Sequence, residues 1–394
     1  MSATPDASNR FPSPPDARLD TGWGTRVSEP PRRFAFAIQT PKDPQSAVYI
    51  GYRSLAAALE ELGHSITIVA PSDFPVVARF SGRWTPLVYP IALASWLWAH
   101  RGQFDLVIFH SYSGWLATAL TRGRPPALVM FHGVEPLYHH ELRAETARSG
   151  GRLSIRYRVL QEVLMPVFLT IACRTASGVA CLNRREAEYL KSRGWISRGN
   201  GHVFAHGVPP EFFLSARAAR PIQTLLFVGQ WLPMKGVRYL VDAAIALLGR
   251  DASLRLVCAG TLTGADAARA AFPIELRDRI RVLPRVDQST LAQLYRESDV
   301  FIFPSLYEGF SRAIAEAMAS RLPIVCTDVG VAADALRDEH SALIIPKHDA
   351  DALVTAVRRL QSDAGLAERL ANAAGDAARE YSLAAVSQRT MDLI

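Results

Sequence analysis

The chain has 394 residues, which is more than one compact core normally holds, so two domains are expected. Hydrophobic residues make up 49% and charged residues 21%, proportions that exclude a disordered protein. Basic residues (44) exceed acidic ones (37), and between Arg33 and Pro210 we count 19 basic and 11 acidic side chains. This basic half suits phosphate-bearing or membrane-surface partners. No helix-turn-helix, zinc-finger or RNA-binding aromatic motif occurs, so no nucleic-acid partner is predicted.

Cysteine usage and apolar stretches indicate the compartment. The four cysteines are far apart and form no CxxC pair, which predicts buried free thiols in a reducing cytoplasm rather than a disulfide framework or a zinc site. The first residues lack a basic segment followed by an apolar run, so no signal peptide is expected. The most apolar windows are interrupted by Pro90 and Pro166, and they fall short of the roughly 20 residues that span a bilayer. A soluble or peripheral protein is predicted.

The elements follow one another in a regular order. Residues 1–32 contain six prolines and predict a disordered leader. From 33 to 206, short apolar runs alternate with helical patterns; residues 207–220 hold the glycine and prolines of a linker, 221–380 repeat the alternation, and 381–394 have a helical pattern. The runs expected to be strands are Phe34–Ile38, Ser65–Val69, Leu106–Phe109, Leu128–Phe131, Gly178–Leu182, His202–Phe204, Thr224–Val228, Leu254–Ala259, Ile280–Leu283, Val300–Phe303, Ile324–Thr327 and Ala342–Ile345.

Two such alternations predict an α/β protein with two doubly wound domains facing a cleft. Continuous runs of β-branched residues are typical of parallel strands buried on both faces. Ligands of doubly wound sheets bind at the carboxyl ends of the strands. The cleft between the domains is therefore the predicted site.

The segment Phe301–Met318, FIFPSLYEGFSRAIAEAM, carries the clearest chemistry. A strand ends at Pro304, a loop carries Glu308 and Gly309, and a helix begins near Ser311. The glycine allows close approach of a ligand, and the helix N-terminus offers unpaired N–H groups and a positive dipole end that suit a diphosphate. Carboxylates such as Glu308 accept hydrogen bonds from sugar hydroxyls. The alternative is an ordinary helix with a capping serine and a surface glutamate.

Leu283–Pro346 resembles the nucleotide-sugar half of the retaining family 4 glycosyltransferases, which have the glycosyltransferase-B fold of two Rossmann-like domains. The similarity rests on LPRVDQSTLAQLYRESDVFIFPSLYEGFSRAIAEAMASRLPIVCTDVG and the following ALIIP. A weaker resemblance covers most of residues 34–380. In the family the first glutamate of E-x7-E contacts the transferred sugar and the second holds the ribose, which implies these roles for Glu308 and Glu316. The backbone of Gly309, Phe310 and Ser311 would then hold the diphosphate.

A second element is Phe227–Gly236, FVGQWLPMKG, where a strand ends at Gly229 and Lys235 opens the next helix. The family usually has an arginine just after the glycine and a lysine a few residues later, both binding diphosphate. Lys235 matches and is expected to bind phosphate as a point charge. Gln230 stands where the arginine is usual, so one positive contact is missing or is supplied elsewhere. A solvated lysine of the first helical turn is the alternative for Lys235.

In the front half, LVMFHGVE places His132 at the carboxyl end of a strand. In related enzymes a histidine there reaches toward the donor sugar, so His132 is the candidate, and a histidine bonded to backbone is the alternative. His110 is a second candidate, while His139 and His140 are expected to be solvated. The first loop, TPKDPQS, lacks the paired glycines of many family members.

Other positions depart from the family or imitate another motif. Arg285 and Arg321 stand where glycine is common, and Val331 stands where a second glycine is usual; such residues could reshape the base pocket or add a phosphate contact. Asp349 and Asp351 form a DxD triplet, but at a helix start, where aspartate is typical of a cap. No metal site and no cofactor are predicted.

The acceptor side is less defined. Tyr89–His100 contains Trp96 and Trp98 and is followed by Arg101, a composition that fits either an amphipathic helix touching lipid or core packing. Arg152–Arg174 is expected to be a buried helix of the domain.

The resemblance implies transfer of a hexose-type sugar from a nucleotide-diphosphate sugar to a glycan or lipid-linked acceptor, with retention of configuration. Polysaccharide or lipid-linked glycan assembly in the cytoplasm or at the inner face of the membrane is the expected context. Family members also return the last helix to the first domain, which is expected for 381–394. Two alternatives stay open: a nucleotide-sugar-binding protein that no longer transfers, and a related enzyme of phosphorolysis or epimerisation.

Overall fold

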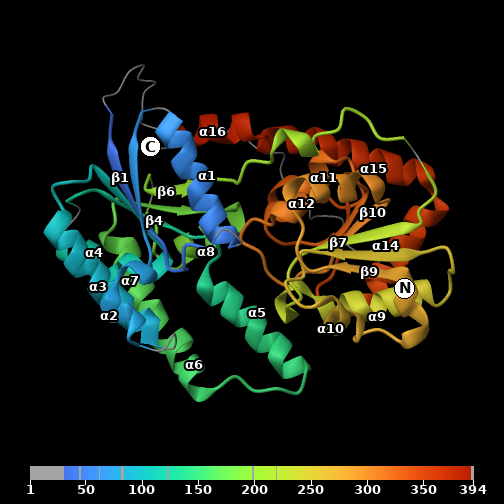
Figure 1. Cartoon of the computed structure of the whole chain (residues 1–394), viewed down its shortest axis with the longest axis horizontal. Coiled ribbons are helices and arrows are strands. Elements are labelled where there is room, and N and C mark those ends of the chain that lie inside the picture. The colour runs from blue at the N-terminus through green and yellow to red at the C-terminus, as the bar shows by residue number, and fades with distance from the viewer. Residues whose placement is uncertain are drawn as a thin grey trace, which may run out of the picture.

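The computed structural model describes residues 31–43, 46–61, 63–80, 84–121, 124–197, 199–218 and 220–391. The predicted leader, residues 1–32, lies outside these ranges except for its last two residues. Two parallel sheets, each with helices on both faces, stand side by side along the long axis of the molecule (Figure 1). The predicted α/β class with two doubly wound, Rossmann-like units is confirmed.

The N-terminal sheet has the strand order β2-β1-β3-β4-β5-β6, and all its strands are parallel. Its first strand shows why helices cover both faces. Phe34 and Phe36 pack with α1 on one side, whereas Ala35 and Ala37 pack with α3 on the other, because successive side chains of a strand point to opposite faces. The elements are β1 (Arg33–Ala37), α1 (Ala47–Glu61), β2 (Ser65–Val69), α2 (Pro75–Ala78), α3 (Thr85–His100), β3 (Leu106–His110), α4 (Trp115–Thr121), β4 (Ala127–Met130), α5 (Glu135–Arg148), α6 (Ile155–Val159), a π-helical turn (Leu160–Leu164), α7 (Met165–Thr175), β5 (Gly178–Cys181), α8 (Arg184–Ser192) and β6 (Gly201–Val203).

The C-terminal sheet has the order β12-β11-β10-β7-β8-β9, again all parallel. Its central strands are fully buried runs, VFIF in β10 and IVCT in β11, as a sheet covered on both faces requires. The elements are β7 (Thr224–Val228), α9 (Val237–Leu248), β8 (Arg255–Ala259), α10 (Ala265–Arg269), β9 (Ile280–Leu283), α11 (Gln288–Glu297), β10 (Val300–Phe303), α12 (Arg312–Ala319), β11 (Ile324–Thr327), α13 (Val331–Ala335), β12 (Leu343–Ile345), α14 (Ala350–Ser362), α15 (Ala364–Ala377) and α16 (Leu383–Met391).

Strand order decides where a ligand can bind. In the C-terminal sheet the order reverses between β7 and β10, and ligands of doubly wound sheets bind at such a switch point. The loop after β7 carries Gly229, Gln230 and Lys235, and the loop after β10 carries Glu308 and Gly309. The candidate residues of this half therefore lie at its topological switch point.

The end of the chain returns to the linker. Val208 donates its N–H to the Tyr381 carbonyl, and Leu383 donates to the Val208 carbonyl. The last helix, α16, lies over the N-terminal half (Figure 1). Among the described residues, no helix is both long and apolar enough to cross a membrane.

Arg321 stands in a left-handed conformation (φ +48°), which explains why glycine suits this position. Its guanidinium does not reach the cleft; it donates to the Leu214 carbonyl (3.0 Å), to Asn372 and to Asp376 (2.8 Å). The expectation of a base-pocket or phosphate contact is wrong for Arg321, because backbone carbonyls and α15 hold its charge.

Gly375→Ala is expected to lower the free energy of unfolding by roughly 1–3 kcal/mol, the usual cost of overpacking. The new Cβ would lie 2.5 Å from Cγ of Arg321, whose guanidinium is fixed at its far end. Urea unfolding measures the change.

The same exchange made in an Arg321→Ala background is the control, since the obstacle is gone and alanine favours a helix interior over glycine by about 1 kcal/mol. Equal effects of Gly375→Ala in the two backgrounds would contradict the packing assigned to Arg321.

Candidate active site

Lys235 and Glu308, predicted from separate motifs, meet at the switch point. The Lys235 ammonium donates to both carboxylate oxygens of Glu308, at 2.6 and 2.8 Å, and the Ser305 hydroxyl donates to Oε1 at 2.7 Å. The Glu308 side chain is only 9% exposed. The carboxylate is thus held by three charge-assisted hydrogen bonds, and the lysine side chain remains one-quarter exposed.

The loop that carries Glu308 touches the N-terminal half. A Cβ on Gly309 would lie 2.5 Å from the His132 carbonyl oxygen, so only glycine allows this approach. Asn183, at the start of α8, donates its side-chain N–H to the Gly309 carbonyl at 2.6 Å. His132 and the Glu308–Gly309 loop, which are 176 residues apart in the sequence, therefore form one site.

His132 lies in an aromatic cluster with Tyr52, His110 and His206, whose ring centroids are 4.8, 5.2 and 5.4 Å from its own. Its Nε2 is buried and has no hydrogen-bond partner among the described residues, and the same holds for Nδ1 of His110. Burial lowers the pKa of His132 well below its usual value, helped by the two neighbouring histidines, and lowers those of His110 and His206 to about 4. All three rings are therefore neutral at pH 7, and the unpartnered nitrogens of His132 and His110 have the chemistry to bond hydroxyl groups.

Ser311 does not cap the helix that follows it. It adopts a left-handed conformation (φ +67°), and its hydroxyl is buried without a partner among the described residues. Such a conformation costs a serine about 1–2 kcal/mol. No backbone acceptor is assigned to the N–H groups of Gly309, Phe310 and Ser311 within the described part of the chain. The strained turn leaves these groups available at the positive end of α12.

The remaining donor-side candidates lie beside this turn or further away. The Phe310 ring is buried between His206 and Tyr381, at centroid distances of 5.4 and 5.8 Å. Gly229 directly follows β7 and donates its N–H to the Ala259 carbonyl. Gln230 comes next and is exposed, with no side-chain bond assigned within the described ranges.

Glu316 is buried within α12 rather than exposed. It lies within 3.5 Å of the Arg312 guanidinium and accepts a hydrogen bond from Tyr295 at 3.2 Å. Burial raises its pKa to about 7, although Arg312 and Tyr295 act in the opposite direction. Each carboxylate oxygen of Glu316 thus has one partner, and burying the charged form of this side chain lowers the stability of the fold.

Two sequence expectations about histidine and aspartate can be compared with the structure. His140 is exposed as predicted, but the prediction for His139 is wrong: it is buried on the inner face of α5, 3.3 Å from Glu162. Asp349 caps α14, accepting from the Ala352 N–H at 2.8 Å, as predicted. Among the described residues no group of three or more His, Cys, Asp or Glu could hold a metal ion.

Several residues of the cleft escaped sequence analysis. The Tyr307 hydroxyl donates to Glu186, which also accepts from the Val134 N–H, so the C-terminal loop is tied to the N-terminal half. Burial raises the pKa of Glu186 to about 7. His206 was predicted only as the last residue of the first domain, with no role in the site. The position of Tyr307 next to Glu308 in the motif was the sequence feature that could have indicated its contact with Glu186.

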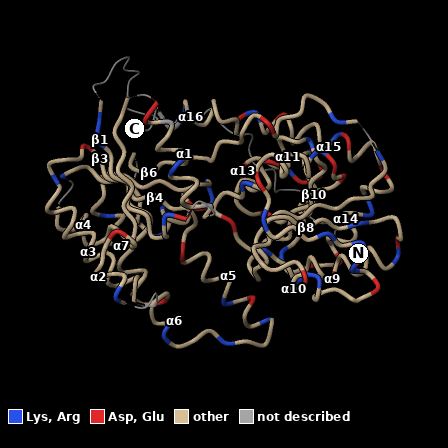
Figure 2. Tube along the Cα trace, in the orientation of Figure 1, with Lys and Arg blue, Asp and Glu red and all other residues tan. Residues whose placement is uncertain are grey.

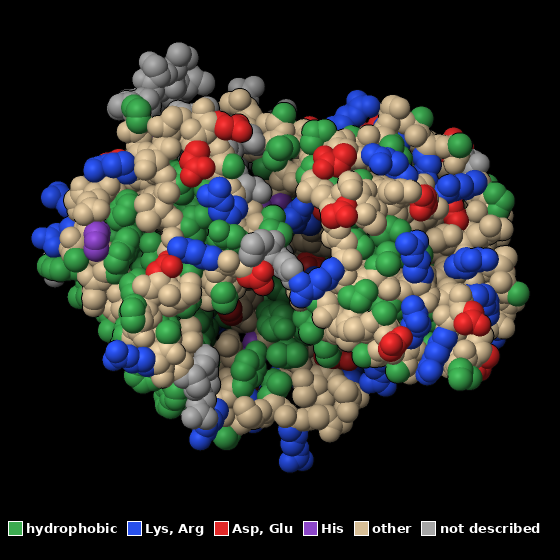
Figure 3. All heavy atoms as spheres, viewed as in Figure 1, with side chains coloured by type: hydrophobic (Ala, Val, Ile, Leu, Met, Phe, Trp, Pro, Cys, Tyr) green, Lys and Arg blue, Asp and Glu red, His purple; other side chains and the backbone are tan. Residues whose placement is uncertain are grey.

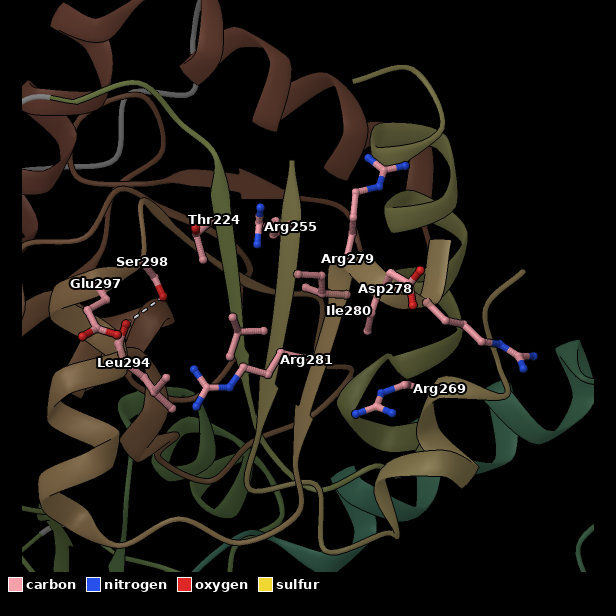
Figure 4. A pocket seen from close by; sticks show the side chains of 13 residues that line it. Thr224, Arg255, Arg269, Asp278, Arg279, Ile280, Arg281, Leu294, Glu297 and Ser298 are labelled. Atoms are coloured by element: carbon pink, nitrogen blue, oxygen red, sulfur yellow. Dashed lines mark hydrogen bonds between the residues drawn. The ribbon is translucent and has the colours of Figure 1, made fainter. Parts of the chain in front are cut away.

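A pocket of about 510 Å³ lies elsewhere, at the amino ends of β7, β8 and β9 (Figure 4). Its walls include Arg255, Arg279 and Arg281, and none of the candidate residues. Arg279 donates to the carbonyls of Leu248 and Asp251 and so serves the fold. The carboxyl ends of the strands, where the predicted residues meet, remain the candidate site.

Both halves of the chain match glycosyltransferase families. Residues 51–212 match the model described as Glycosyltransferase Family 4, and residues 222–363 match that described as Glycosyl transferases group 1. These matches support a family 4 glycosyltransferase. Structures agree: sucrose-phosphate synthase from Thermosynechococcus elongatus superposes with a TM-score of 0.72 at 18% identity over 92% of this chain and 98% of its own, which shows the glycosyltransferase-B fold.

The relatives have different acceptors. D-inositol 3-phosphate glycosyltransferase of Salinispora tropica is 36% identical over 40% of this chain and 34% of its own length. Phosphatidyl-myo-inositol mannosyltransferase of Mycobacterium leprae is 26% identical over 90% of this chain and 93% of its own. HepE from Anabaena, solved with UDP-glucose, has a TM-score of 0.66 at 15% identity over 92% of this chain and 99% of its own. The chain spans only 34 to 44% of the length of the first curated relatives it matches.

Glu316→Gln is expected to stabilise the protein increasingly as the pH rises from 4.5 to 7. The folded pKa of Glu316, about 7, lies above the unfolded value of 4.5, so its contribution to stability is present below pH 4.5 and is lost as the pH rises through 7. Glutamine avoids this loss, by about 3 kcal/mol at most. Urea unfolding at pH 5 and pH 8 measures it.

The control is Glu368→Gln, which removes an exposed carboxylate of α15. A difference between Glu316→Gln and the natural protein that stays constant from pH 5 to pH 8 would contradict the burial assigned to Glu316.

Proposed function

We propose that this chain is a retaining hexosyltransferase that moves a sugar from a nucleotide-diphosphate sugar to an acceptor hydroxyl. The observation that carries the proposal is the convergence of Lys235, Glu308 and His132 where Gly309 touches the backbone of the opposite half. Phosphate-binding, hydroxyl-accepting and neutral nitrogen groups from two sheets face one cleft. The two family matches and the UDP-glucose complex of HepE support the donor class.

The diphosphate would bind between Lys235 and the free amides of Gly309, Phe310 and Ser311. These donors are fixed before the ligand arrives, and preorganised donors of this kind stabilise the charge that develops on a leaving group. Lys235 is at present paired with Glu308, so a bound phosphate would share the lysine and free one carboxylate oxygen for a sugar hydroxyl. Glu316, whose oxygens also contact Arg312 and Tyr295, would accept from the ribose in addition to these partners.

Arg312 is proposed to supply the positive charge that Gln230 lacks. It begins α12, directly after the strained turn at Ser311. Its charge adds to the effect of burial in lowering the pKa of His206, which supports a position of Arg312 near the histidine cluster. It is also one-third exposed. The loss of the usual arginine after Gly229 is thus compatible with donor binding.

Retention is proposed to follow from the leaving phosphate itself. In this scheme the acceptor hydroxyl attacks the anomeric carbon from the face that the diphosphate leaves, and the phosphate oxygen takes the acceptor proton. The bond from the anomeric carbon to the diphosphate breaks while the bond to the acceptor oxygen forms. Neutral His132 would orient a sugar hydroxyl, and no metal or cofactor is assigned a part.

The proposed acceptor is a glycan or a lipid-linked glycan, in polysaccharide or lipid-linked glycan assembly. The four free cysteines are buried, which fits the proposed location in the reducing cytoplasm. Nucleic acid is not a proposed partner. A protein of this fold that binds the nucleotide sugar without transfer is the second candidate. Gln230, which stands where the family usually has an arginine, favours this second candidate. A measurement of sugar transfer distinguishes the two candidates.

A thermal-shift screen against uridine, guanosine and adenosine diphosphates and their sugar conjugates tests donor binding. A ligand that binds the folded state raises Tm, and Lys235→Ala should abolish this shift. Arg238→Ala is the matched control, because it removes an equal charge from an exposed position three residues further on. Equal shifts in both variants would exclude Lys235 from the donor site, and no shift with any nucleotide would contradict the proposal.

Glu308→Gln separates transfer from binding. The variant keeps the shape of the side chain but loses the charge that pairs with Lys235 and accepts sugar hydroxyls. Transfer with the donor found in the screen should fall by about 10²–10³-fold, equivalent to about 2–4 kcal/mol, as for other single electrostatic contacts. Nuclear magnetic resonance of the product gives the anomeric configuration. Inversion would overturn the retaining assignment, and donor binding without turnover in the natural protein would favour the second candidate.

A further inference from the structure

The outer helices of the N-terminal half carry an unusual share of exposed apolar side chains. Ten of the sixteen exposed large hydrophobic side chains among the described residues lie on or beside α2, α3, α4 and the continuous helix α6–α7. Each is at least 46% exposed. We call this surface the outer helical face. Its exposed residues are Val76, Phe80, Trp84, Ile91, Trp98, Leu120, Ile155, Val159, Val163 and Val167.

On α3 the exposed residues repeat every seven positions. Trp84, just before the helix, and Ile91 and Trp98 within it fall on one side, because seven residues make almost two turns. The other side buries Leu93 and Leu97 against the sheet. Core packing and an amphipathic helix touching lipid were alternatives for this segment, and the structure shows one buried and one exposed face of the helix.

The helix α6–α7 has a longer exposed stripe. Ile155, Val159, Val163 and Val167 recur every four residues on its outer side. Its second half buries Met165, Leu169, Ala172 and Cys173 in the core. The expectation of a buried helix over residues 152–174 is therefore wrong for its first half, where the hydrophobic side chains face solvent.

The two stripes belong to one surface. Helix α4 packs against both α3 and α7, and α2 packs against α3. Figure 3 shows hydrophobic side chains grouped over the lower left of the molecule, where Figure 1 places α2, α3 and α6. Monomeric proteins rarely expose extended apolar patches, and larger ones mark protein or membrane partners.

Charge distinguishes these two partners. No acidic residue occurs between Phe74 and Phe104, and the traces of α2 and α3 carry no charged residue within the helices (Figure 2). On α6–α7 the one acidic residue, Glu162, is paired with Arg143 and Arg158. Exposed arginines at the borders include Arg79, Arg101 and Arg156.

We infer that the outer helical face docks the protein on an anionic lipid bilayer. Separate apolar stripes bordered by arginines match a membrane interface, where tryptophan and basic residues are favoured. Arg101 lies over the Trp98 ring at 4.4 Å, so that its charge stays at the rim while the ring faces outward. A second copy of the chain is the poorer partner, because the same face would bring its own arginines opposite these. The inference concerns a surface apart from the cleft and does not depend on sugar transfer.

Co-sedimentation of the full chain with vesicles tests the inference without donor or acceptor. Vesicles of phosphatidylcholine containing about 30 mol% phosphatidylglycerol should bind the protein at low salt, and vesicles of phosphatidylcholine alone should bind it at least tenfold less. Raising the salt should weaken binding, because exposed charges are screened. No binding to the anionic vesicles at low salt would overturn the inference.

Two substitutions locate the surface. Trp98→Ser combined with Val163→Ser changes one exposed residue on each stripe and should weaken vesicle binding at least tenfold. Ile274→Ser, an exposed residue of the C-terminal half, is the control and should bind as the natural protein does. Equal vesicle binding by the double variant and by Ile274→Ser would overturn the assignment of the lipid-binding surface. A dimer in size-exclusion chromatography that only the double variant loses would also overturn it. The nucleotide thermal shift, measured on the same samples, reports folding and donor binding separately.

Discussion

The geometry of the candidate site depends on one contact between the two halves, that of the Gly309 loop with the backbone at His132. Each half has its own sheet, and the candidate site between them depends on a loop of one half that reaches a strand end of the other. Gly309 makes the approach sterically possible, and Asn183 holds the same loop by its carbonyl at 2.6 Å. Tyr307 adds a third link through Glu186 and Val134. The two halves are joined within a few residues of the candidate carboxylate, so motion of one half would move Glu308 directly.

Much of the chemistry here depends on polar groups that burial penalises. Glu316 and Glu186 have pKa values raised to about 7 by burial, whereas His110 and His206 have values lowered to about 4. Both effects favour neutral forms. Lys235 pairs with the buried Glu308 carboxylate, so these two charges balance, and a ligand with its own negative charge would give the lysine a second partner. The unpartnered Nε2 of His132 and hydroxyl of Ser311 would then bond to hydroxyl groups of such a ligand.

The sheets followed from the sequence because parallel strands buried on both faces need continuous apolar runs, and such runs are visible without any knowledge of neighbours. Glu308 and Lys235 were singled out by motifs that resemble the family, and their roles in the site stay predictions. What the sequence could not indicate were contacts between distant segments. His206 matters only because Gly51 and His132 lie beside it, and Tyr307 only because Glu186 faces it. The prediction for His139 was wrong because Glu162, from the π-helical turn after α6, contacts this side of α5.

The same limit explains the outer helical face. Apolar residues give the same pattern in a sequence whether they lie in the core or on the surface. The periodicity of α6–α7 alone could therefore not separate Val163 from Leu169. The structure separates them, because the sheet can take only one side of each helix. A helix of a soluble monomer would gain solubility from polar residues on its outer side at no cost to the core, yet here valine and tryptophan occupy those positions. This composition supports the inferred lipid contact, and the arginines at the borders of the face favour an anionic partner.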